Sequence, residues 1–413
     1  MLLQQIQLSK DFFNKQIDDT STYNHMKINR SEEVSDKGLS VESVLVLQGG
    51  GSLGAYECGV YKTLAKHSIK FDIVSGTSIG ALNAAVIAAH SYDNAKGSTE
   101  KLEDFWLELA ETLIPLPQQF SLLYFTDEAR AILASMYSAM YGNPKAFFPI
   151  WIASNFFNYL QPFRPLPYPL FDIAPLKETL SHYVDFNNLG KPDRPRLIVT
   201  STNIQTSEPV VFDSEQMDID VDHVIASAGF PFYGIAWTQK DNKYLWDGAL
   251  LSNTPLREVI DASPASDKIL YLVNIFPHSQ KELPQDMFEA WHRARDIIYT
   301  DKTDNNIRLS RIISRHLSLL KEMHDLLMIS NIKFKEKGDD AKLKDRFDKM
   351  ELEYNKLARR RGAIIKEIVR IERPEKTHFL FEDADFSIST IKKLIRQGEE
   401  DTEKALATKN NDQ

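Results

Sequence analysis

The sequence contains almost no cysteine. Cys58 is the only one among 413 residues, so the chain can form neither an intramolecular disulfide nor a zinc site built from several thiolates. It also lacks any run of about 18 uninterrupted apolar residues, so we expect no helix that spans a bilayer. The start of the sequence lacks the basic stretch and the continuous apolar core of a secretory signal. These absences predict a cytoplasmic protein.

An excess of positive charge is missing as well. The 49 basic residues stand against 58 acidic ones and give a formal net charge of −9, which argues against a general nucleic-acid binder. Hydrophobic residues make up 43% of the chain and aromatic residues 10%, which is enough for a sizeable core and excludes a wholly disordered chain. At roughly 100–200 residues per domain, the length allows two to four domains, or one large domain with an appendage.

The order of the apolar runs predicts the fold class. Residues 1–42 are polar with little periodicity, and we expect them to form a polar N-terminal arm. Short apolar runs with the character of buried strands then follow at 44–47, 71–74, 196–199 and 269–273. Glycine turns and helical stretches come after the first two runs, which is the alternation of an α/β protein. We therefore expect an α/β domain, with a parallel-type central sheet flanked by helices, over residues 43–280.

The composition changes after about residue 285 toward helix formers and charged residues. Apolar residues recur there at helical spacing, and a break at Gly338 divides the pattern, which predicts two long helices joined at that point. We expect residues 281–413 to form an α-helical C-terminal extension. Its amphipathic spacing is compatible with pairing to another chain and with packing on its own core.

A segment rich in aromatic residues and proline, about residues 120–175, interrupts the α/β pattern. Each proline removes a backbone N–H and fixes φ, so regular secondary structure cannot run through the second half of this segment. Two interpretations remain open. The segment is either a cap packed over the core, or an apolar lid or acyl-chain wall that touches a membrane.

The first glycine turn lies directly after the first predicted strand. Its sequence, Gly49 to Gly54, fits G-x-G-x-x-G, and Asp72 lies 23 residues after Gly49, near the spacing of a ribose-binding carboxylate. Glycines at the start of a helix let backbone N–H groups point outward at an anion. That anion is either a pyrophosphate or the oxyanion of a tetrahedral intermediate.

The second glycine turn distinguishes these two readings. Gly76, Ser78 and Gly80 form G-x-S-x-G between a predicted strand and a predicted helix. This is the context of a nucleophile elbow, in which the flanking glycines permit a sharp turn and the serine hydroxyl stands clear at the helix start. The pattern predicts Ser78 as a nucleophile.

A serine nucleophile needs a base. His182 and His223 have no accompanying motif and resemble ordinary helix or loop residues. The better candidate is Asp247, where an apolar run delivers a carboxylate to a turn formed by Gly248 and Ala249. A carboxylate sheltered by its apolar neighbours has a raised pKa, which makes it a more competent base than a free aspartate.

Together these motifs resemble the patatin-like phospholipase family, in its bacterial branch with a helical C-terminal extension, over about residues 44–405. The resemblance implies a three-layer α/β core and a Ser–Asp dyad without histidine, with Ser78 as nucleophile and Asp247 as base. It also implies that the backbone N–H groups of Gly49, Gly50 and Gly51 form the oxyanion hole.

Two further features of the resemblance concern single segments. Residues 226–231 resemble a family segment near the site. At the position of Leu53 the family often has arginine or lysine, so this chain departs from the pattern there. The backbone donors of the loop do not depend on that side chain.

The motifs and the resemblance predict a lipid acyl hydrolase that cleaves carboxylic esters of phospholipids or lysophospholipids through an acyl-serine intermediate. The alternative is a non-catalytic lipid-binding scaffold with a degenerate site. Two further enzyme classes fit less of the sequence. A dinucleotide binder would use the first glycine turn and Asp72, and a Ser–His–Asp esterase would need a histidine between 278 and 378.

The expected partners follow from this function. They are a phospholipid or other acyl-ester substrate and, at the periphery of the protein, a membrane surface, with no nucleic acid. No metal and no organic cofactor are implied, and the sequence contains no EF-hand-like calcium loop.

Overall fold

The computed structural model describes residues 41–111, 127–150, 168–264, 266–280, 283–329, 339–361, 364–374 and 381–411. The N-terminal arm predicted for 1–42 lies outside these residues except for its last two. Of the aromatic segment at 120–175, only 127–150 and the part from residue 168 onward are described. Within the described residues, no helix is long and apolar enough to cross a membrane.

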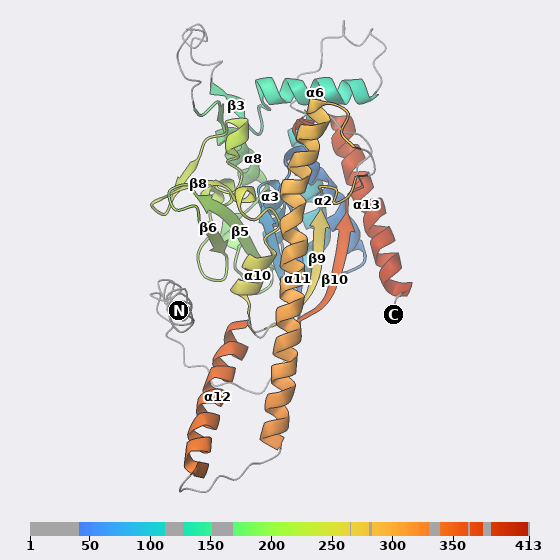
Figure 1. Ribbon diagram of the computed structural model, residues 1–413. Helices are drawn as coiled ribbons and strands as arrows, with labels where there is room; N and C mark the ends of the chain where they lie inside the picture. The colour runs from blue at the N-terminus through green and yellow to red at the C-terminus, as the bar shows by residue number, and fades with distance from the viewer. Residues whose placement is uncertain are drawn as a thin grey trace, which may run out of the picture. The chain divides into compact units, whose positions relative to one another are not determined.

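In the described part of the chain, a mixed sheet of eight strands forms the centre (Figure 1). The strands β10, β9, β1, β2 and β5 lie side by side in this order and run parallel. Beyond them, β6 and β8 both pair antiparallel with β5, and β7 pairs with β8. The strands are β1 (Val41–Leu47), β2 (Ile73–Thr77), β5 (Arg196–Asn203), β6 (Pro209–Asp213), β7 (Thr238–Lys240), β8 (Lys243–Asp247), β9 (Asp267–Asn274) and β10 (Ile365–Glu372). The predicted α/β class with a parallel-type sheet is confirmed.

Apolar residues on both faces of the strands produce three layers. Leu45 and Leu47 of β1 belong to a large buried cluster, whereas Val44 and Val46 belong to a second cluster on the opposite face. Successive side chains of a strand point to opposite faces, so an uninterrupted apolar run is buried only if helices cover both. One face is covered by α2 (Ala55–Lys66), α3 (Ile79–Ala88), α4 (Ala95–Glu111), α8 (Ala174–Tyr183) and α13 (Ile388–Asn411), and the other by α10 (Leu256–Ala262) and part of α11 (Met287–Ile329).

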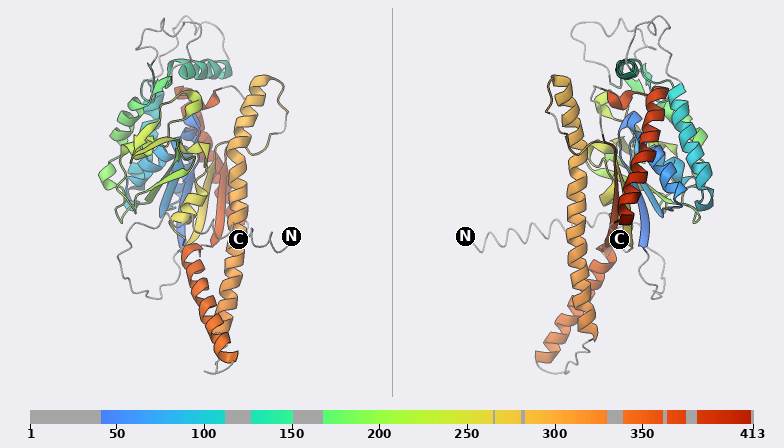
Figure 2. Two further views of the ribbon diagram at one scale, coloured as in Figure 1. Left: turned by 60° about the vertical axis from the view of Figure 1, so that its left-hand side comes forward. Right: turned by 90° about the vertical axis from the view of Figure 1, so that its right-hand side faces the viewer.

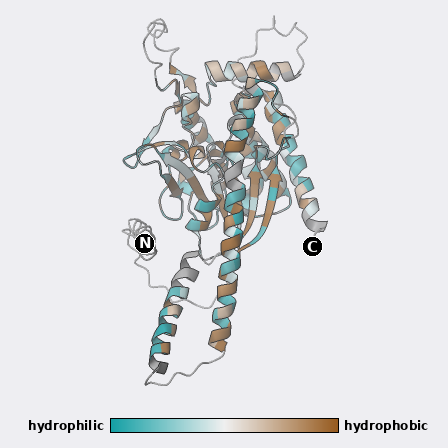
Figure 3. Ribbon diagram, viewed as in Figure 1, coloured by the Kyte–Doolittle hydropathy of each residue, from teal (hydrophilic) through white to brown (hydrophobic). Residues whose placement is uncertain are grey.

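The two long helices predicted around Gly338 are α11 and α12 (Asp339–Arg361). The first part of α11 packs along the sheet, and its second part lies beside α12, away from the sheet (Figures 1 and 2). Hydrophobic and hydrophilic residues alternate along this second part (Figure 3). Leu309, Leu319 and Leu326 are each more than half exposed there.

The strand β10 lies within residues 281–413, for which the sequence predicts only helices, so that prediction is incomplete. The segment 365–372 mixes charged residues with isoleucine and valine, which have high strand propensity, and this composition suits the edge strand that it forms beside β9. The chain after residue 280 therefore completes the central sheet as well as forming helices.

The C-terminal helix α13 packs closely against α2. A Cβ atom added to Gly59 of α2 would lie 1.8 Å from the carbonyl oxygen of Ile395, and one added to Gly398 of α13 would lie 2.1 Å from that of Tyr56. The two helices can approach this closely only because each has a glycine at the crossing. Because α2 follows the first glycine turn, this contact fixes the helix at whose start that turn lies.

We predict that Gly59→Ala lowers the free energy of unfolding by about 1–3 kcal/mol, because its methyl group forces the two helices apart. Thermal or denaturant unfolding measures this change. Gly97→Ala in α4 is the control, since the nearest atoms to its Cβ belong to the exposed side chain of Asn94 and not to backbone, and we expect it to change the free energy of unfolding less than Gly59→Ala does. Equal stability of the wild type and Gly59→Ala would contradict the close packing.

Candidate active site

Ser78 lies at a sharp turn between β2 and α3. Its backbone dihedrals, φ 55° and ψ −126°, fall in a region that residues with a side chain rarely adopt. The flanking glycines are required, because a Cβ on Gly76 would lie 2.1 Å from the carbonyl oxygen of Gly80, and one on Gly80 would lie 2.7 Å from that of Leu47. The turn therefore has the geometry of the nucleophile elbow that the sequence predicts.

Hydroxyl groups from neighbouring elements hold this turn. The backbone N–H of Ser78 donates to Oγ of Ser227 at 2.8 Å, and the Ser227 hydroxyl donates to the carbonyl of Thr200 in β5. The Thr77 hydroxyl donates to the carbonyl of Ser252 at 2.8 Å. Residues 226–231 stand out in the sequence only through their resemblance to a family segment, which does not predict this role of Ser227.

Asp247 ends β8 and faces Ser78. Its Oδ2 accepts a hydrogen bond from Oγ of Ser78 at 2.6 Å, and its Oδ1 accepts one from the backbone N–H of Ala249 at 2.8 Å. Burial raises the pKa of the Asp247 carboxyl from its ordinary value of 3.8 to about 7, although these two hydrogen bonds oppose the rise. With this pKa, about half of the Asp247 carboxyls are ionised at neutral pH, and the ionised form is basic enough to accept a proton from an adjacent hydroxyl.

The turn formed by Gly248 and Ala249 supports the base. A Cβ on Gly248 would lie 2.4 Å from the carbonyl oxygen of Thr200, so only glycine fits between Asp247 and β5. The N–H of the next residue, Ala249, is the group that fixes Oδ1 of the aspartate.

The first glycine turn follows β1 and lines the same pocket as Ser78. The Gly49 N–H donates to the carbonyl of Asn253 at 3.3 Å, and the Asn253 side chain donates back to the carbonyl of Gly49 at 3.2 Å. The N–H groups of Gly50 and Gly51 have no hydrogen-bond acceptor among the described residues. Of the three donors expected from the sequence, these two are available to a ligand.

Steric contacts explain why this turn consists of glycines. A Cβ on Gly50 would lie 2.3 Å from Cδ1 of Ile275, and one on Gly51, which has φ +57°, would lie 2.2 Å from the carbonyl oxygen of Asp383. Gly54 packs against the start of α3 instead, since a Cβ on Gly54 would lie 2.8 Å from the side chain of Ile79.

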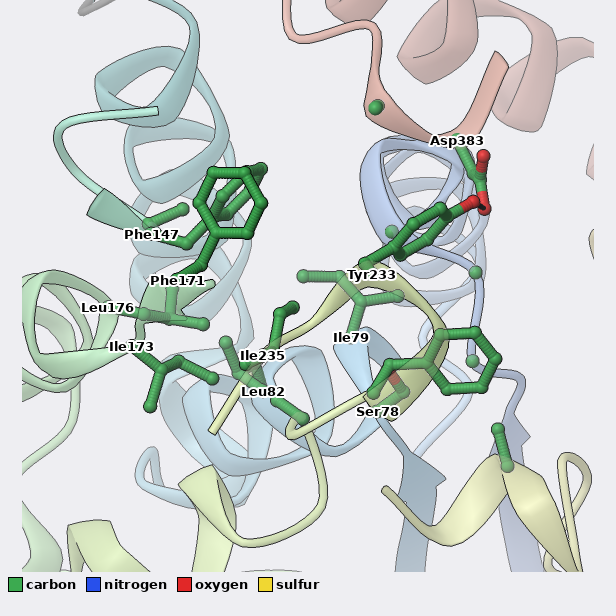
Figure 4. Close-up of a pocket in the computed structure, with 18 of the residues that line it drawn as sticks. Ser78, Ile79, Leu82, Phe147, Phe171, Ile173, Leu176, Tyr233, Ile235 and Asp383 are labelled. Atoms are coloured by element: carbon green, nitrogen blue, oxygen red, sulfur yellow. Dashed lines mark hydrogen bonds between the residues drawn. The ribbon is translucent and has the colours of Figure 1, made fainter. Parts of the chain in front are cut away.

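The pocket beside Ser78 has mostly apolar walls. Side chains from several elements face it in Figure 4. The apolar ones include Leu82, Phe147, Phe171, Ile173, Leu176 and Ile235. Phe147 and Phe171 pack edge to face at 5.5 Å and come from the aromatic segment predicted at 120–175. The described part of that segment therefore forms one wall of the pocket.

The residues required by the competing interpretations lie elsewhere. Asp72 precedes β2, whereas the first glycine turn follows the parallel strand β1, so the two are at opposite ends of the sheet and cannot grip one dinucleotide. His223 completes the capping box of α9 (Val221–Ile225), whose N-cap is Asp220, and also contacts Asp241. Among the described residues, no histidine lines the pocket.

The described part of the chain also contains no group of three or more His, Cys, Asp or Glu side chains arranged to hold a metal ion.

Comparison with known proteins supplies the family. Residues 45–260 match the family model described as patatin-like phospholipase, which is more than half of the 413 residues. A lysophospholipase NTE1 from Meyerozyma guilliermondii is 39% identical over 84 residues, which is 19% of this chain and 6% of that protein. The triacylglycerol lipase SDP1L from Arabidopsis thaliana is 42% identical over 50 residues, 12% of this chain and 6% of that protein. The matched segments are thus a small fraction of these relatives.

Two solved structures are also similar. VipD from Legionella pneumophila is 14% identical, with a TM-score of 0.37 and coverage of 92% of this chain and 72% of that one. The type III effector ExoU is 13% identical, with a TM-score of 0.31 and coverage of 89% and 53%. From the family match, the chain belongs to the patatin-like phospholipase family, a family of serine hydrolases.

Proposed function

We propose that this protein hydrolyses carboxylic esters of phospholipids or lysophospholipids with Ser78 as nucleophile and Asp247 as base. The observation that carries the proposal is the 2.6 Å hydrogen bond from the serine hydroxyl to a buried carboxylate, beside an apolar pocket. The relatives named lysophospholipase and triacylglycerol lipase support a fatty acyl ester as the substrate.

In the first half of the reaction, Asp247 accepts the proton of Ser78 as Oγ attacks the ester carbonyl carbon. The negative charge that forms on the carbonyl oxygen faces the N–H groups of Gly50 and Gly51, and one such donor is typically worth about 10²–10³ in rate. Asp247 then returns its proton to the leaving alcohol as the tetrahedral intermediate collapses. The acyl group remains on Ser78.

In the second half, Asp247 takes a proton from a water molecule that attacks the acyl-serine carbonyl. The same N–H groups face the second oxyanion, and collapse releases the fatty acid while the proton returns to Ser78. The apolar wall that contains Phe147 and Phe171 is suited to the acyl chain, because it buries methylene groups away from water.

A membrane surface is the natural source of such a substrate. The helix α6 (Asp127–Tyr141) has three large side chains, Met136, Met140 and Tyr141, that are 45%, 56% and 44% exposed. This helix packs near the short helix η8 (Glu382–Ala384), whose residues Asp383 and Ala384 line the pocket. We propose that these exposed residues make the peripheral contact through which an ester leaves the lipid surface.

We predict that Ser78→Ala and Asp247→Asn each abolish turnover of mixed-acyl phospholipid vesicles and of a soluble short-chain ester. Release of fatty acid or alcohol measures the rate. Asp241→Asn is a matched control at an aspartate outside the pocket, and we expect normal turnover from it. Near-normal turnover by Asp247→Asn would refute the dyad. Lipid binding that survives Ser78→Ala, without hydrolysis by the wild type, would favour the lipid-binding scaffold.

The substitution Asp247→Asn also has an expected effect on the stability of the fold. The pKa of Asp247 is higher in the folded protein than its ordinary value, so the folded state holds this proton more tightly than the unfolded one and loses stability as the pH rises from about 4 to about 7. Asp247→Asn removes that loss. We predict that at pH 8 it unfolds at the same temperature as the wild type or higher, and a clearly lower unfolding temperature would contradict the assigned burial cost.

The pKa of Asp247 near 7 also predicts the pH dependence of the reaction. The base must be ionised, so kcat/KM on a soluble ester should be nearly constant above about pH 8 and fall about tenfold per pH unit well below pH 7. A pH series with an inert buffer measures this, with circular dichroism to verify folding at each pH. A rate that stays constant down to pH 5 would exclude Asp247 as the base.

The loop geometry predicts the effect of Gly51→Ala. The added methyl group meets the carbonyl of Asp383, and the residue's positive φ disfavours alanine, so the loop moves and the N–H donors lose their alignment. We expect kcat to fall by about 10²-fold, as for loss of one oxyanion donor. Gly97→Ala is again the control, and an unchanged kcat in a folded Gly51→Ala protein would contradict the assignment of this loop.

A further inference from the structure

A cluster of buried charged side chains lies behind the first glycine turn. Its carboxylates are Asp296 of α11 and Glu382 and Asp383 of η8, and its guanidinium groups are Arg295 of α11 and Arg373, which follows β10. Asp296, Glu382, Asp383 and Arg373 are all at most 8% exposed. None of these residues takes part in the proton transfers proposed above.

The short helix η8 is the part of this cluster that touches the glycine turn. The Ser52 hydroxyl donates to the carbonyl of Glu382 at 3.2 Å. The backbone of Gly51 packs so closely against the carbonyl of Asp383 that a Cβ on Gly51 would lie 2.2 Å from it. The position of η8 therefore sets the position of the turn that presents the N–H groups of Gly50 and Gly51.

Two arginines in turn fix η8. Nη1 of Arg295 lies 3.3 Å from Oδ1 of Asp383, and Nη1 of Arg373 donates to Oε1 of Glu382 at 2.8 Å. Nε of Arg373 also donates to the carbonyl of Ile275 at 2.7 Å, which anchors it beyond the end of β9. Burial by itself lowers the pKa of Arg295, but Asp383, Asp296 and Glu382 raise it above its usual value, so this guanidinium stays charged.

The cluster reaches the pocket through Asp383. The Tyr233 hydroxyl donates to Oδ2 of this carboxylate at 2.6 Å, and both residues line the pocket on the side opposite the aromatic wall (Figure 4). The guanidinium of Arg295 also lies 5.1 Å above the ring of Phe276, another lining residue. Arg295 thus connects α11 both to η8 and to the pocket wall.

The glycine turn itself contributes no cation. Leu53 of this turn is 1% exposed and belongs to the apolar core. We propose that Arg295 is a positioning residue for the oxyanion hole: through Asp383 it holds η8 against Gly51 and Ser52 and so keeps the two free N–H groups directed at the pocket. This inference rests on the proposed role of the turn in ester hydrolysis.

The chemistry of the cluster explains why arginine is needed. The planar guanidinium reaches Asp383 with Nη1, while its Nη2 lies 3.1 Å from Oδ1 of Asp296 and 3.7 Å from Oε2 of Glu382. A lysine ammonium is a single point charge and cannot hold three carboxylates in this fork geometry. Removing the cation altogether would leave the buried carboxylates of Asp296 and Asp383 without their guanidinium partner, which is strongly destabilising.

The test uses Arg295→Lys, which keeps the charge and loses the fork. In the full-length protein we expect kcat on a soluble ester to fall about tenfold or more while KM changes less than about twofold, because a small displacement of the donors affects the transition state and not the acyl pocket. Amide hydrogen exchange of residues 50–54 should become faster. Asp383→Asn breaks the same ion pair without adding volume. Like Arg295→Lys, it should lower kcat and make the amide exchange of residues 50–54 faster.

Arg308→Lys is the matched control, since Arg308 lies on the exposed side of the same helix. It should leave kcat and the exchange of residues 50–54 unchanged. Wild-type kcat and wild-type exchange in folded Arg295→Lys and Asp383→Asn would overturn the proposal, and so would an increase in KM at constant kcat. If the wild type hydrolyses no ester, the proposed function is refuted. Faster exchange of residues 50–54 in the variants would still support the positioning contact in that case.

Discussion

The hydrogen bond between Ser78 and Asp247 is the interaction on which the rest of the site depends, and the register of β5 makes it possible. Thr77, the residue before the nucleophile, pairs with Thr200 of β5, and Asp247 pairs with the next residue of that strand, Ser201. The strands β2 and β8 flank β5, one parallel and one antiparallel to it. Their carboxyl ends therefore lie on either side of the same short stretch of β5, at Thr200 and Ser201. Two residues 169 positions apart in sequence thus reach a separation of 2.6 Å.

This arrangement has energetic costs that the core must offset. Ser78 adopts a positive φ without being glycine, and Asp247 is held 1% exposed with a pKa far above that of a free aspartate. The surrounding layers are well suited to oppose both costs, because β2 is buried along its whole length and α3 is buried at every position. An isolated β–turn–α segment would relax out of this geometry.

The sequence predicted the parts of the fold and site that have a local signature. The elbow at Ser78 is recognisable because two glycines and a serine occur between an apolar run and a helix, and the raised pKa of Asp247 follows from its apolar neighbours. The strand β10 was missed because its charged residues lie within a long helical context. The role of η8 and Arg295 depends on contacts between α11, β9 and the segment after β10, and no spacing along the chain encodes such contacts. The hydrogen bond from Gly49 to Asn253 is of the same kind: it joins residues 204 positions apart.

The most direct test of the central claim is to trap the acyl-enzyme. The protein is mixed with a long-chain ester, quenched in acid within a turnover and digested for peptide mass spectrometry. The account predicts an adduct with the mass of the acyl group on the peptide that contains Ser78 in the wild type, and no adduct in Asp247→Asn. An adduct on a different residue, or steady hydrolysis with an unmodified Ser78 peptide at every quench time, would contradict it.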